Sequence, residues 1–339
     1  MKKLLSILLV FALLTLSACT PRQAPVTTAD TTVPTETSQS PTEETTTEQT
    51  TEPEETDEPS SPVLYKATDS EGNVVYLMGS IHVGMDNMYP LPQYVLDAYN
   101  ASDALAVEID IIAANKDLSG AMDAARAMVL DDGTKISDHI SEECYEKAVE
   151  ILEENNTYYR ALDMYKPVMW YSLISTLAME KAGAQSDMGV DMYFLELAHD
   201  EDKTIYEIES VDEQYALLGG MSMELQALML EQTVELYGSA LYNMSIRLMC
   251  TAWASGDGEG LLTMTDTDTA GMSEEEAKLM EEFNLSLVGA RNVNMTQYAE
   301  DALKSGETVF IVVGAAHVLG DDGMAKGLEA LGYTVELVQ

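Results

Sequence analysis

The sequence predicts an α/β (α+β) fold: a central mixed β-sheet core, built from a strand and a Gly-x-x-His motif at both ends of the domain, with a large helical insert. Residues 74–78 and 309–313 predict the sheet, because each is a compact apolar run bounded by glycine and polar turn residues, as buried strands are. Long helical patterns between these two runs predict the insert. An apolar fraction of 46% supplies enough surface for a hydrophobic core.

The first nineteen residues predict a lipoprotein signal peptide. Lys2 and Lys3 precede an almost unbroken apolar run at 4–16, which is short for a permanent membrane span and typical of a secretory signal. Small residues then precede Cys19, and this ending resembles a bacterial lipobox, whose cysteine receives a diacylglyceryl group and becomes the mature N-terminus. Two acyl chains make a stable membrane anchor. The alternative is an ordinary cleaved signal in which Cys19 is incidental.

Residues 20–61 are predicted to form a disordered linker. The segment consists mainly of Thr, Pro, Glu and Ser, with ten acidic residues and one arginine. A composition this polar cannot bury enough apolar surface to offset the entropy of ordering the chain. Charge repulsion and proline keep such a tether extended. We therefore expect it to hold the folded part away from the bacterial cell envelope, on the extracytoplasmic face of the membrane.

Residues 62–339 are predicted to form one domain, with further strands and helices between the two outer runs. Short strands are expected at 104–109, 204–208 and 333–338. Helices are expected at 93–100, 141–155, 167–182, 190–199, 223–254, 274–287 and 293–304. The two cysteines of this region, Cys144 and Cys250, could pair in an oxidising compartment, although no motif around them decides the matter.

The charge balance argues against nucleic acid as a partner. The chain carries 17 Lys and Arg against 59 Asp and Glu, a formal net charge of −42. Affinity for nucleic acid comes from basic residues that displace counterions from the phosphates, so this surface repels a polyanion. An acidic membrane surface is excluded as an electrostatic partner for the same reason.

The two outer strands end in the same motif. In Gly79-x-x-His82 and Gly314-x-x-His317, an apolar strand is followed by a glycine and by a histidine three residues after it. Binding and catalytic groups gather at such strand ends, where a rigid sheet aims a loop side chain. Two neutral imidazoles delivered there could ligate one divalent ion. The alternative for each is an ordinary packing histidine.

Two carboxylates are candidates for the further ligand that a metal site needs. Glu108 is the first, because an acid inside an apolar strand is costly to bury unless it is paired or binds a cation. Glu209 has the same position relative to the strand before it. Both could instead be strand-end carboxylates that hydrogen-bond to solvent or backbone. The remaining histidines, His139 and His199, are expected to be structural or to face solvent.

Several short stretches of residues 62–339 share their order and spacing with one protein family. They are Gly79-Ser80-Ile81-His82-Val83-Gly84, Tyr89-Pro90-Leu91-Pro92, Val107-Glu108-Ile109-Asp110, Lys166-Pro167, Gly189-Val190-Asp191, Glu207-Ile208-Glu209 with Gln214, Trp253 with Gly256-Asp257, Arg291-Asn292, and Gly314-Ala315-Ala316-His317 with Gly320. On these stretches the chain resembles the TraB/PrgY/GumN family, whose eukaryotic relatives are the TIKI metalloproteases.

The resemblance implies a metal-dependent hydrolase whose active centre contains both Gly-x-x-His histidines and a glutamate. The ligands would be His82, His317 and Glu108, and Glu108 would also count among the catalytic residues with Glu209 as a base and Arg291 as the group that stabilises an oxyanion. Whether Glu108 or Glu209 is the third ligand stays open. The ion would be Zn, Mn or Co, which such ligands suit comparably. A His-Glu-x-x-His helix is absent from the sequence, so the chain is not an ordinary zincin.

Other residues are expected around these ligands. Asp191 is expected to accept a hydrogen bond from a ligating histidine rather than to bind the ion, and Asn292 is assigned to the same surroundings. Tyr89 and Trp253 could line a substrate groove or could belong to the core or its rim.

The sequence leaves two functions open. The first is a membrane-anchored, extracytoplasmic metallopeptidase that acts on a peptide or protein substrate and is held to the membrane by lipidated Cys19. The second is a non-catalytic lipoprotein that binds or sequesters a pheromone-like peptide. Metal-dependent cleavage that is lost in His82→Ala and His317→Ala would favour the first. Metal-independent peptide binding that survives both substitutions would favour the second.

Overall fold

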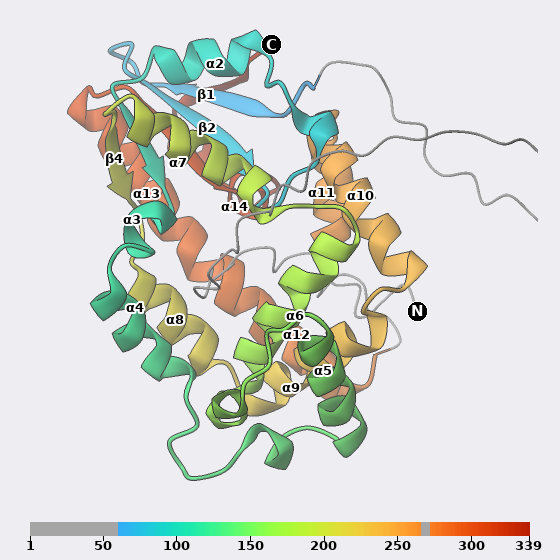
Figure 1. Cartoon of the computed structure of the whole chain (residues 1–339). Helices are drawn as coiled ribbons and strands as arrows, with labels where there is room; N and C mark the ends of the chain where they lie inside the picture. Colours follow the sequence, from blue (N-terminus) through green and yellow to red (C-terminus); the bar gives the residue numbers. More distant parts are fainter. Residues whose placement is uncertain (1–59, 266–271) are drawn as a thin grey trace, which may run out of the picture. The chain divides into compact units, whose positions relative to one another are not determined.

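The computed structural model of the chain describes residues 60–265 and 272–339. Cys19, the predicted signal peptide and nearly all of the predicted linker lie outside the described residues. The described part contains a six-stranded mixed sheet with helices on both faces, which confirms the predicted α/β class (Figure 1). The strands are β1 (Leu64–Thr68), β2 (Val74–Ser80), β3 (Ala104–Val107), β4 (Thr204–Glu207), β5 (Val309–Gly314) and β6 (Thr334–Leu337).

The strand order is β4-β3-β5-β2-β1-β6. The strands β4, β3, β5 and β2 run parallel to their neighbours, whereas β1 is antiparallel to both β2 and β6. The two outer strands of the sequence prediction are therefore direct neighbours in the sheet, with Ser80 opposite Gly314. Both Gly-x-x-His motifs consequently leave the sheet at the same edge.

The strand predictions differ from the structure at some boundaries. β3 ends at Val107 and β4 ends at Glu207, one or two residues before the expected ends. A backbone hydrogen bond from Glu209 N to Glu108 O still joins the chain just beyond these two ends, at 2.9 Å. No strand is predicted at β1, because its five residues mix apolar, charged and polar side chains. Pairing with β2 and β6 holds β1 in the sheet.

Fourteen α-helices, a few short 3₁₀ turns and one π-helical turn complete the described part. The helices are α2 (Gln93–Asn100), α3 (Ile111–Ala114), α4 (Leu118–Ala125), α5 (Glu142–Glu154), α6 (Pro167–Lys181), α7 (Val190–Asp200), α8 (Val211–Gly220), α9 (Met223–Leu236), α10 (Ala240–Ala254), α11 (Gly258–Thr265), α12 (Glu274–Asn284), α13 (Ala290–Ser305), α14 (Ala315–Val318) and α15 (Met324–Ala330). The π turn, η6 (Leu285–Gly289), joins α12 to α13.

The single helix predicted at 223–254 is wrong, because the structure divides it into α9 and α10. Gly238 has a φ of +68°, a left-handed conformation that glycine adopts without steric cost and that ends a helix. Ser239 then begins α10 by accepting a hydrogen bond from the backbone N–H of Tyr242. The helix predicted at 274–287 is α-helical to Asn284 and continues from Leu285 as the π turn.

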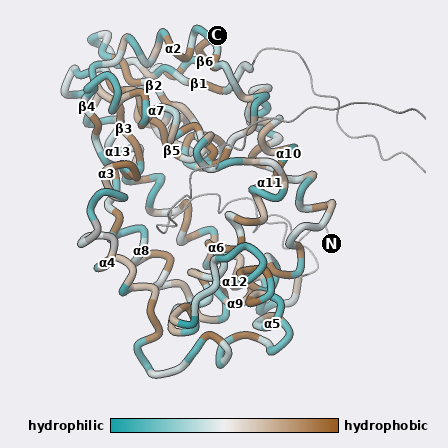
Figure 2. Tube along the Cα trace, viewed as in Figure 1, coloured by the Kyte–Doolittle hydropathy of each residue, from teal (hydrophilic) through white to brown (hydrophobic). Residues whose placement is uncertain are grey.

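Hydrophobic side chains fill both faces of the sheet. On one face α13 and α15 cover Leu77 and Ile311. On the other face the rings of Tyr99 in α2 and Phe194 in α7 contact Phe310, with centroid distances of 5.8 and 4.9 Å. Every residue of β5 is buried, and Figure 2 colours this strand as hydrophobic. Burial on both faces explains why a central parallel strand is a continuous apolar run in the sequence.

The predicted large helical insert comes from two connections of the sheet. The chain between β3 and β4 supplies α3 to α7, and the chain between β4 and β5 supplies α8 to α13. Helices from both connections pack together, with α6 and α5 against α9. Cys144 and Cys250 are buried free thiols, and burial raises the pKa of each to about 12. No helix in the described ranges has the length and apolar character needed to span a membrane.

Candidate metal and catalytic centre

The candidate residues follow the ends of four adjacent parallel strands. In sheet order, Glu209 follows β4, Glu108 follows β3, His317 follows β5 and His82 follows β2. In this strand order the next strand after β3, which is β4, lies on one side of the neighbouring pair β3 and β5, whereas the next strand after β5, which is β6, lies on the opposite side. The direction of the chain connections therefore reverses between β3 and β5. Open α/β sheets bind ligands in the crevice beyond the strand ends at such a reversal. The sheet topology thus places these four residues where a site is expected.

His82 is held by a carboxylate from α7. Its Nδ1 lies 2.9 Å from Oδ2 of Asp191, and the side chains are 12% and 18% exposed. Burial lowers the pKa of His82, but Asp191 and then Glu108 outweigh burial and hold this pKa above its usual value. The other ring nitrogen, Nε2, is buried and has no hydrogen-bond partner among the described residues.

His317 is held by an amide from α13. Its Nδ1 lies 2.6 Å from Oδ1 of Asn292, and Nδ2 of Asn292 donates to the carbonyl oxygen of Asp322 at 2.7 Å. This second bond fixes the amide orientation, so Oδ1 must accept the proton of His317 Nδ1. The lone pair then lies on Nε2, which is 3.9 Å from Oε1 of Glu108. Burial lowers the pKa of His317 to about 4.

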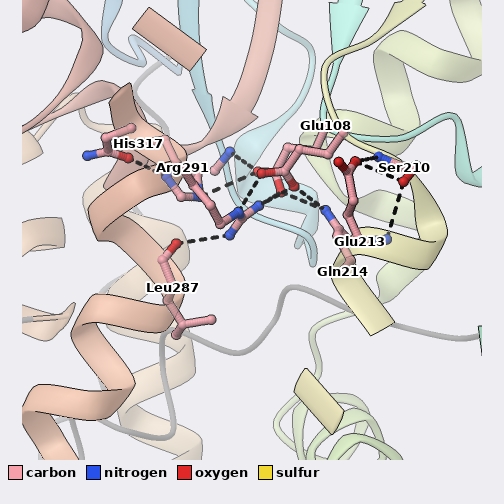
Figure 3. A network of polar contacts seen from close by, with 10 residues as sticks. Glu108, Ser210, Glu213, Gln214, Leu287, Arg291 and His317 are labelled. Carbon is pink, nitrogen blue, oxygen red and sulfur yellow. Dashed lines mark hydrogen bonds and ion pairs between the residues drawn. The ribbon is translucent and has the colours of Figure 1, made fainter. Parts of the chain in front are cut away.

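Arg291 joins the two carboxylates (Figure 3). Its Nε donates to Glu209 Oε1 at 2.6 Å, and its Nη2 donates to Glu108 Oε2 at 2.6 Å and to Glu209 Oε2 at 2.8 Å. Nη1 donates to the carbonyl oxygen of Leu287 in the π turn at 3.0 Å. Within the described residues these bonds engage four of the five N–H groups of the guanidinium. The predicted oxyanion role of Arg291 therefore depends on the remaining Nη1–H.

Gln214 of α8 is also a member of this network, although its place in the sequence motif does not predict a role for it. Its Nε2 donates to Glu108 at 3.2 Å and to Glu209 at 2.9 Å. The signal for it is its spacing, because a residue five positions after Glu209 lies in the first turns of the helix that follows β4. Because the amide of Gln214 is neutral, the sequence gives no charge pattern from which its contacts with the two carboxylates could be predicted.

Glu108 is ionised in this setting. Burial raises its pKa, but Arg291, His317, His82 and the N–H of Gly314 together lower it to about 2. The same carboxylates hold the pKa of Arg291 above its usual value against the effect of burial. Two carboxylates face one guanidinium, so the network keeps an unbalanced negative charge when His82 and His317 are neutral.

The residues fit a divalent cation in part. Two imidazoles whose Nδ1 atoms are held by Asp191 and Asn292 leave Nε2 available, and His82 Nε2 lacks any partner in the described part of the chain. The buried oxygen atoms Ser80 Oγ and Asp191 Oδ1 also have no hydrogen-bond partner there. However, in residues 60–265 and 272–339 no three His, Cys, Asp or Glu side chains are grouped closely enough to hold a metal ion.

Four other residues singled out in the sequence lie outside this network. His199, expected to be structural or to face solvent, is 33% exposed and lies 2.8 Å from buried Asp110, and His139 hydrogen-bonds to Thr134. Trp253 is a core residue that donates to the carbonyl oxygen of Gly79 at 2.7 Å. Tyr89 is partly buried and donates to the carbonyl oxygen of Met188 at 2.7 Å.

The pKa values of the two candidate histidine ligands are expected to differ from that of an ordinary histidine in opposite directions, with His82 above it and His317 below it. At pH 5.5 in chelator-treated protein, His82 should carry a proton, because Asp191 raises its pKa, whereas His317 should stay neutral until about pH 4. NMR titration of the four imidazoles measures this directly. In Asp191→Asn the midpoint of His82 should fall and that of His317 should barely move. Coincident midpoints for His82 and His317 would contradict the described environments.

Comparison with known proteins identifies relatives of this chain. The sequence profile of the TraB/PrgY/gumN family matches residues 63–337. The chain is 25% identical over 145 residues to the uncharacterized protein YbaP of Escherichia coli (strain K12), and equally to YbaP of Shigella flexneri. The aligned part is 42% of this chain and 51% of YbaP, so the chain spans about half the length of the curated relatives it matches. No solved structure matches the chain significantly.

Proposed function

The chain belongs to the TraB/PrgY/gumN family, and from this premise we propose that it is a metal-dependent hydrolase that acts on peptides. The proposal is supported by two imidazoles and a carboxylate that follow the ends of adjacent parallel strands: His317 and Glu108 are buried, and His82 is 12% exposed with a buried Nε2. His82 and His317 are each held through Nδ1, and Glu108 lies beside His317. A histidine that serves only packing is expected to have both ring nitrogens hydrogen-bonded when they are buried. The Nε2 of His82 is buried and has no hydrogen-bond partner within the described residues.

In the proposed reaction His82 Nε2, His317 Nε2 and Glu108 would hold a Zn, Mn or Co ion. When bound there, the ion supplies Lewis acidity and lowers the pKa of water to about 7. Asp191 and Asn292 keep the two imidazoles in the tautomer that presents Nε2. Asn292 and His317 are buried, and His82 and Asp191 are only 12% and 18% exposed, so little water reaches these side chains and their electrostatic contacts are strengthened.

Glu209 and Arg291 would handle the proton and the developing charge. Both Glu209 oxygens accept hydrogen bonds from Arg291, so Glu209 would accept a proton through a lone pair that these bonds leave free. The Nη1–H of Arg291 that has no partner among the described residues would donate to a developing oxyanion. A permanent charge that is already positioned needs no reorganisation during the reaction.

Metal content tests the proposal without depending on activity. Full-length protein purified without chelator should contain about one divalent ion per chain, as measured by elemental analysis. His82→Ala and His317→Ala should lose it, because two ligands remain at most. His199→Ala, which removes a histidine paired with Asp110 outside the network, should keep the metal. A full complement of metal in either ligand variant would contradict the proposal.

A second function, a lipoprotein that binds a peptide without cleaving it, is favoured by one observation. Both Glu108 oxygens already accept hydrogen bonds, from Arg291, Gln214 and the Gly314 N–H, and the described residues hold no close three-ligand group. Peptide cleavage by metal-loaded protein, lost in His82→Ala, would reject this alternative. Peptide affinity that persists in metal-free protein and in both variants, without cleavage, would establish it.

We also propose that the protein is anchored by a lipid on Cys19 at the extracytoplasmic face of the bacterial cell membrane. Support comes from the basic start, the short apolar run and the small residues before Cys19. Radiolabelled palmitate supplied to cells should enter the full chain and should be lost in Cys19→Ser. Cys144→Ser, which replaces a buried thiol, should keep the label. Label retained in Cys19→Ser would reject the anchor.

A further inference from the structure

A cavity of about 160 Å³ lies beside the carboxylate and arginine network, beyond the ends of β3 and β4. Glu108, Glu209, Arg291 and Gln214 form its polar end. Most of its wall is apolar and is formed by Ile208 after β4, Leu217 and Leu218 of α8, and Leu287 of the π turn. Glu213 of α8 and Asn294 of α13 also line it.

The volume of the cavity and its mainly apolar wall favour the binding of an apolar group. An engineered cavity of about 150 Å³ lined by aliphatic and aromatic side chains stays dry and binds benzene. A group as large as a phenyl ring or a leucine side chain therefore fits here, and its burial is favourable because it removes apolar surface from water. A bulkier group requires the walls to move.

The polar end of the cavity favours a ligand that carries a hydrogen-bond donor. Gln214 is 7% exposed, and its Nε2 is already committed to Glu108 and Glu209. Its Oε1 is buried and has no donor among the described residues. A buried acceptor without a donor is unfavourable, so a ligand that donates an N–H to Gln214 Oε1 gains from this hydrogen bond.

The charges at the polar end reject an anion. Glu108 and Glu209 bring two negative charges against the single positive charge of Arg291. A carboxylate placed in the cavity would lie against this excess without a free cation among the lining residues. The cavity thus suits a neutral apolar group attached to an N–H, which is what an apolar residue of a peptide presents.

We propose that this cavity binds the apolar side chain of a substrate residue, with the backbone N–H of that residue donating to Gln214 Oε1. The inference rests on the proposed peptide hydrolase, and it assigns to Leu217 and Leu287 a part in selecting the substrate residue. The cavity adjoins the reacting groups at Glu108 and Arg291, so the selected residue lies next to the bond that is cleaved.

Small probes test the cavity on the full-length protein without any reaction. N-Benzylacetamide carries a phenyl group and an amide N–H, and benzyl acetate has nearly the same shape without the N–H. Ligand-observed NMR titration should show the amide binding at least fivefold more tightly than the ester, which corresponds to about 1 kcal/mol for the hydrogen bond. Equal affinities, or no binding of the amide, would overturn the proposal.

Matched variants locate the binding. Leu217→Phe fills the cavity and should weaken N-benzylacetamide at least tenfold, whereas Leu177→Phe, at a half-buried leucine of α6 away from the cavity, should leave the affinity unchanged. Leu217→Ala enlarges the cavity and should favour the naphthyl analogue over the phenyl probe. An affinity that none of the Leu217 substitutions changes would overturn the proposal.

Cleavage of a peptide panel separates this inference from the function on which it rests. With metal-loaded protein, peptides that differ at one position should be cleaved roughly tenfold faster or more with Leu or Phe than with Asp. Probe binding as expected without any cleavage supports the cavity and rejects the hydrolase. Cleavage with neither probe binding nor a preference for apolar residues supports the hydrolase and rejects the cavity as the subsite.

Discussion

Replacing Arg291 with leucine is expected to lower the free energy of unfolding by about 3–5 kcal/mol, the typical cost of removing one partner from a buried ion pair. Glu108 and Glu209 are 7% and 13% exposed and would keep their charges without the cation that now contacts both. The loss comes mainly from these two uncompensated carboxylates rather than from missing contacts. Urea unfolding followed by circular dichroism measures it.

Two further variants serve as controls for this result: a substitution of the surface residue Arg126, and a second substitution at Glu209 in the Arg291→Leu background. Arg126 pairs with Asp123 at the surface, where the side chains are 78% and 59% exposed, so Arg126→Leu should cost at most about 1 kcal/mol. Adding Glu209→Gln to Arg291→Leu should recover part of the loss, because one buried charge is removed. Equal losses for the two arginine variants, or no recovery, would contradict the described network.

Replacing Gly84 with alanine is expected to cost about 3 kcal/mol, at the high end for a single substitution. A Cβ at Gly84 would lie 1.9 Å from the carbonyl oxygen of Met188, a backbone atom that no side-chain rotation can move. Gly84 also exchanges two backbone hydrogen bonds with Gln185, at 2.8 and 2.9 Å. The loop at 185–189 must therefore shift, and thermal or urea unfolding measures the cost.

The same substitution should disturb the candidate centre, because this loop leads directly into α7 and Asp191. We expect the NMR titration midpoint of His82 to fall in Gly84→Ala as Asp191 moves away from its Nδ1. Gly220→Ala is the control, since a Cβ there meets nothing within 4 Å and its φ is not positive. That variant should be neutral or slightly stabilising. A His82 midpoint unchanged in Gly84→Ala would show that the loop does not position Asp191.

The strands that carry the candidate residues are recognisable in the sequence, because buried parallel strands leave a local apolar pattern. Gly79-x-x-His82 and Gly314-x-x-His317 are recognisable for the same reason, and Glu108 stands out as an acid in an apolar run. The break between α9 and α10 is not foreseen, because the apolar pattern continues past Gly238 and only the backbone conformation reveals the end of α9.

The pairing of side chains across long sequence distances is not readable from local pattern. Arg291 contacts Glu108 and Glu209 only because the π turn and α13 run past the ends of β3 and β4. The family resemblance implies an oxyanion role for Arg291, but its two carboxylate partners depend on tertiary packing. The contacts of Gln214 with Glu108 and Glu209 also depend on tertiary packing. They are harder to predict from the sequence, because a neutral amide carries no charge that would indicate a carboxylate partner.

The place of β5 in the sheet determines when the centre can assemble. β5 lies between β2 and β3, yet it leaves the ribosome about two hundred residues after β3. Until it inserts, the neighbouring edges of both earlier strands stay open to other chains. A polypeptide interrupted before residue 309 would thus keep these two strand edges unpaired, would be prone to associate, and would lack His317, one of the candidate ligands.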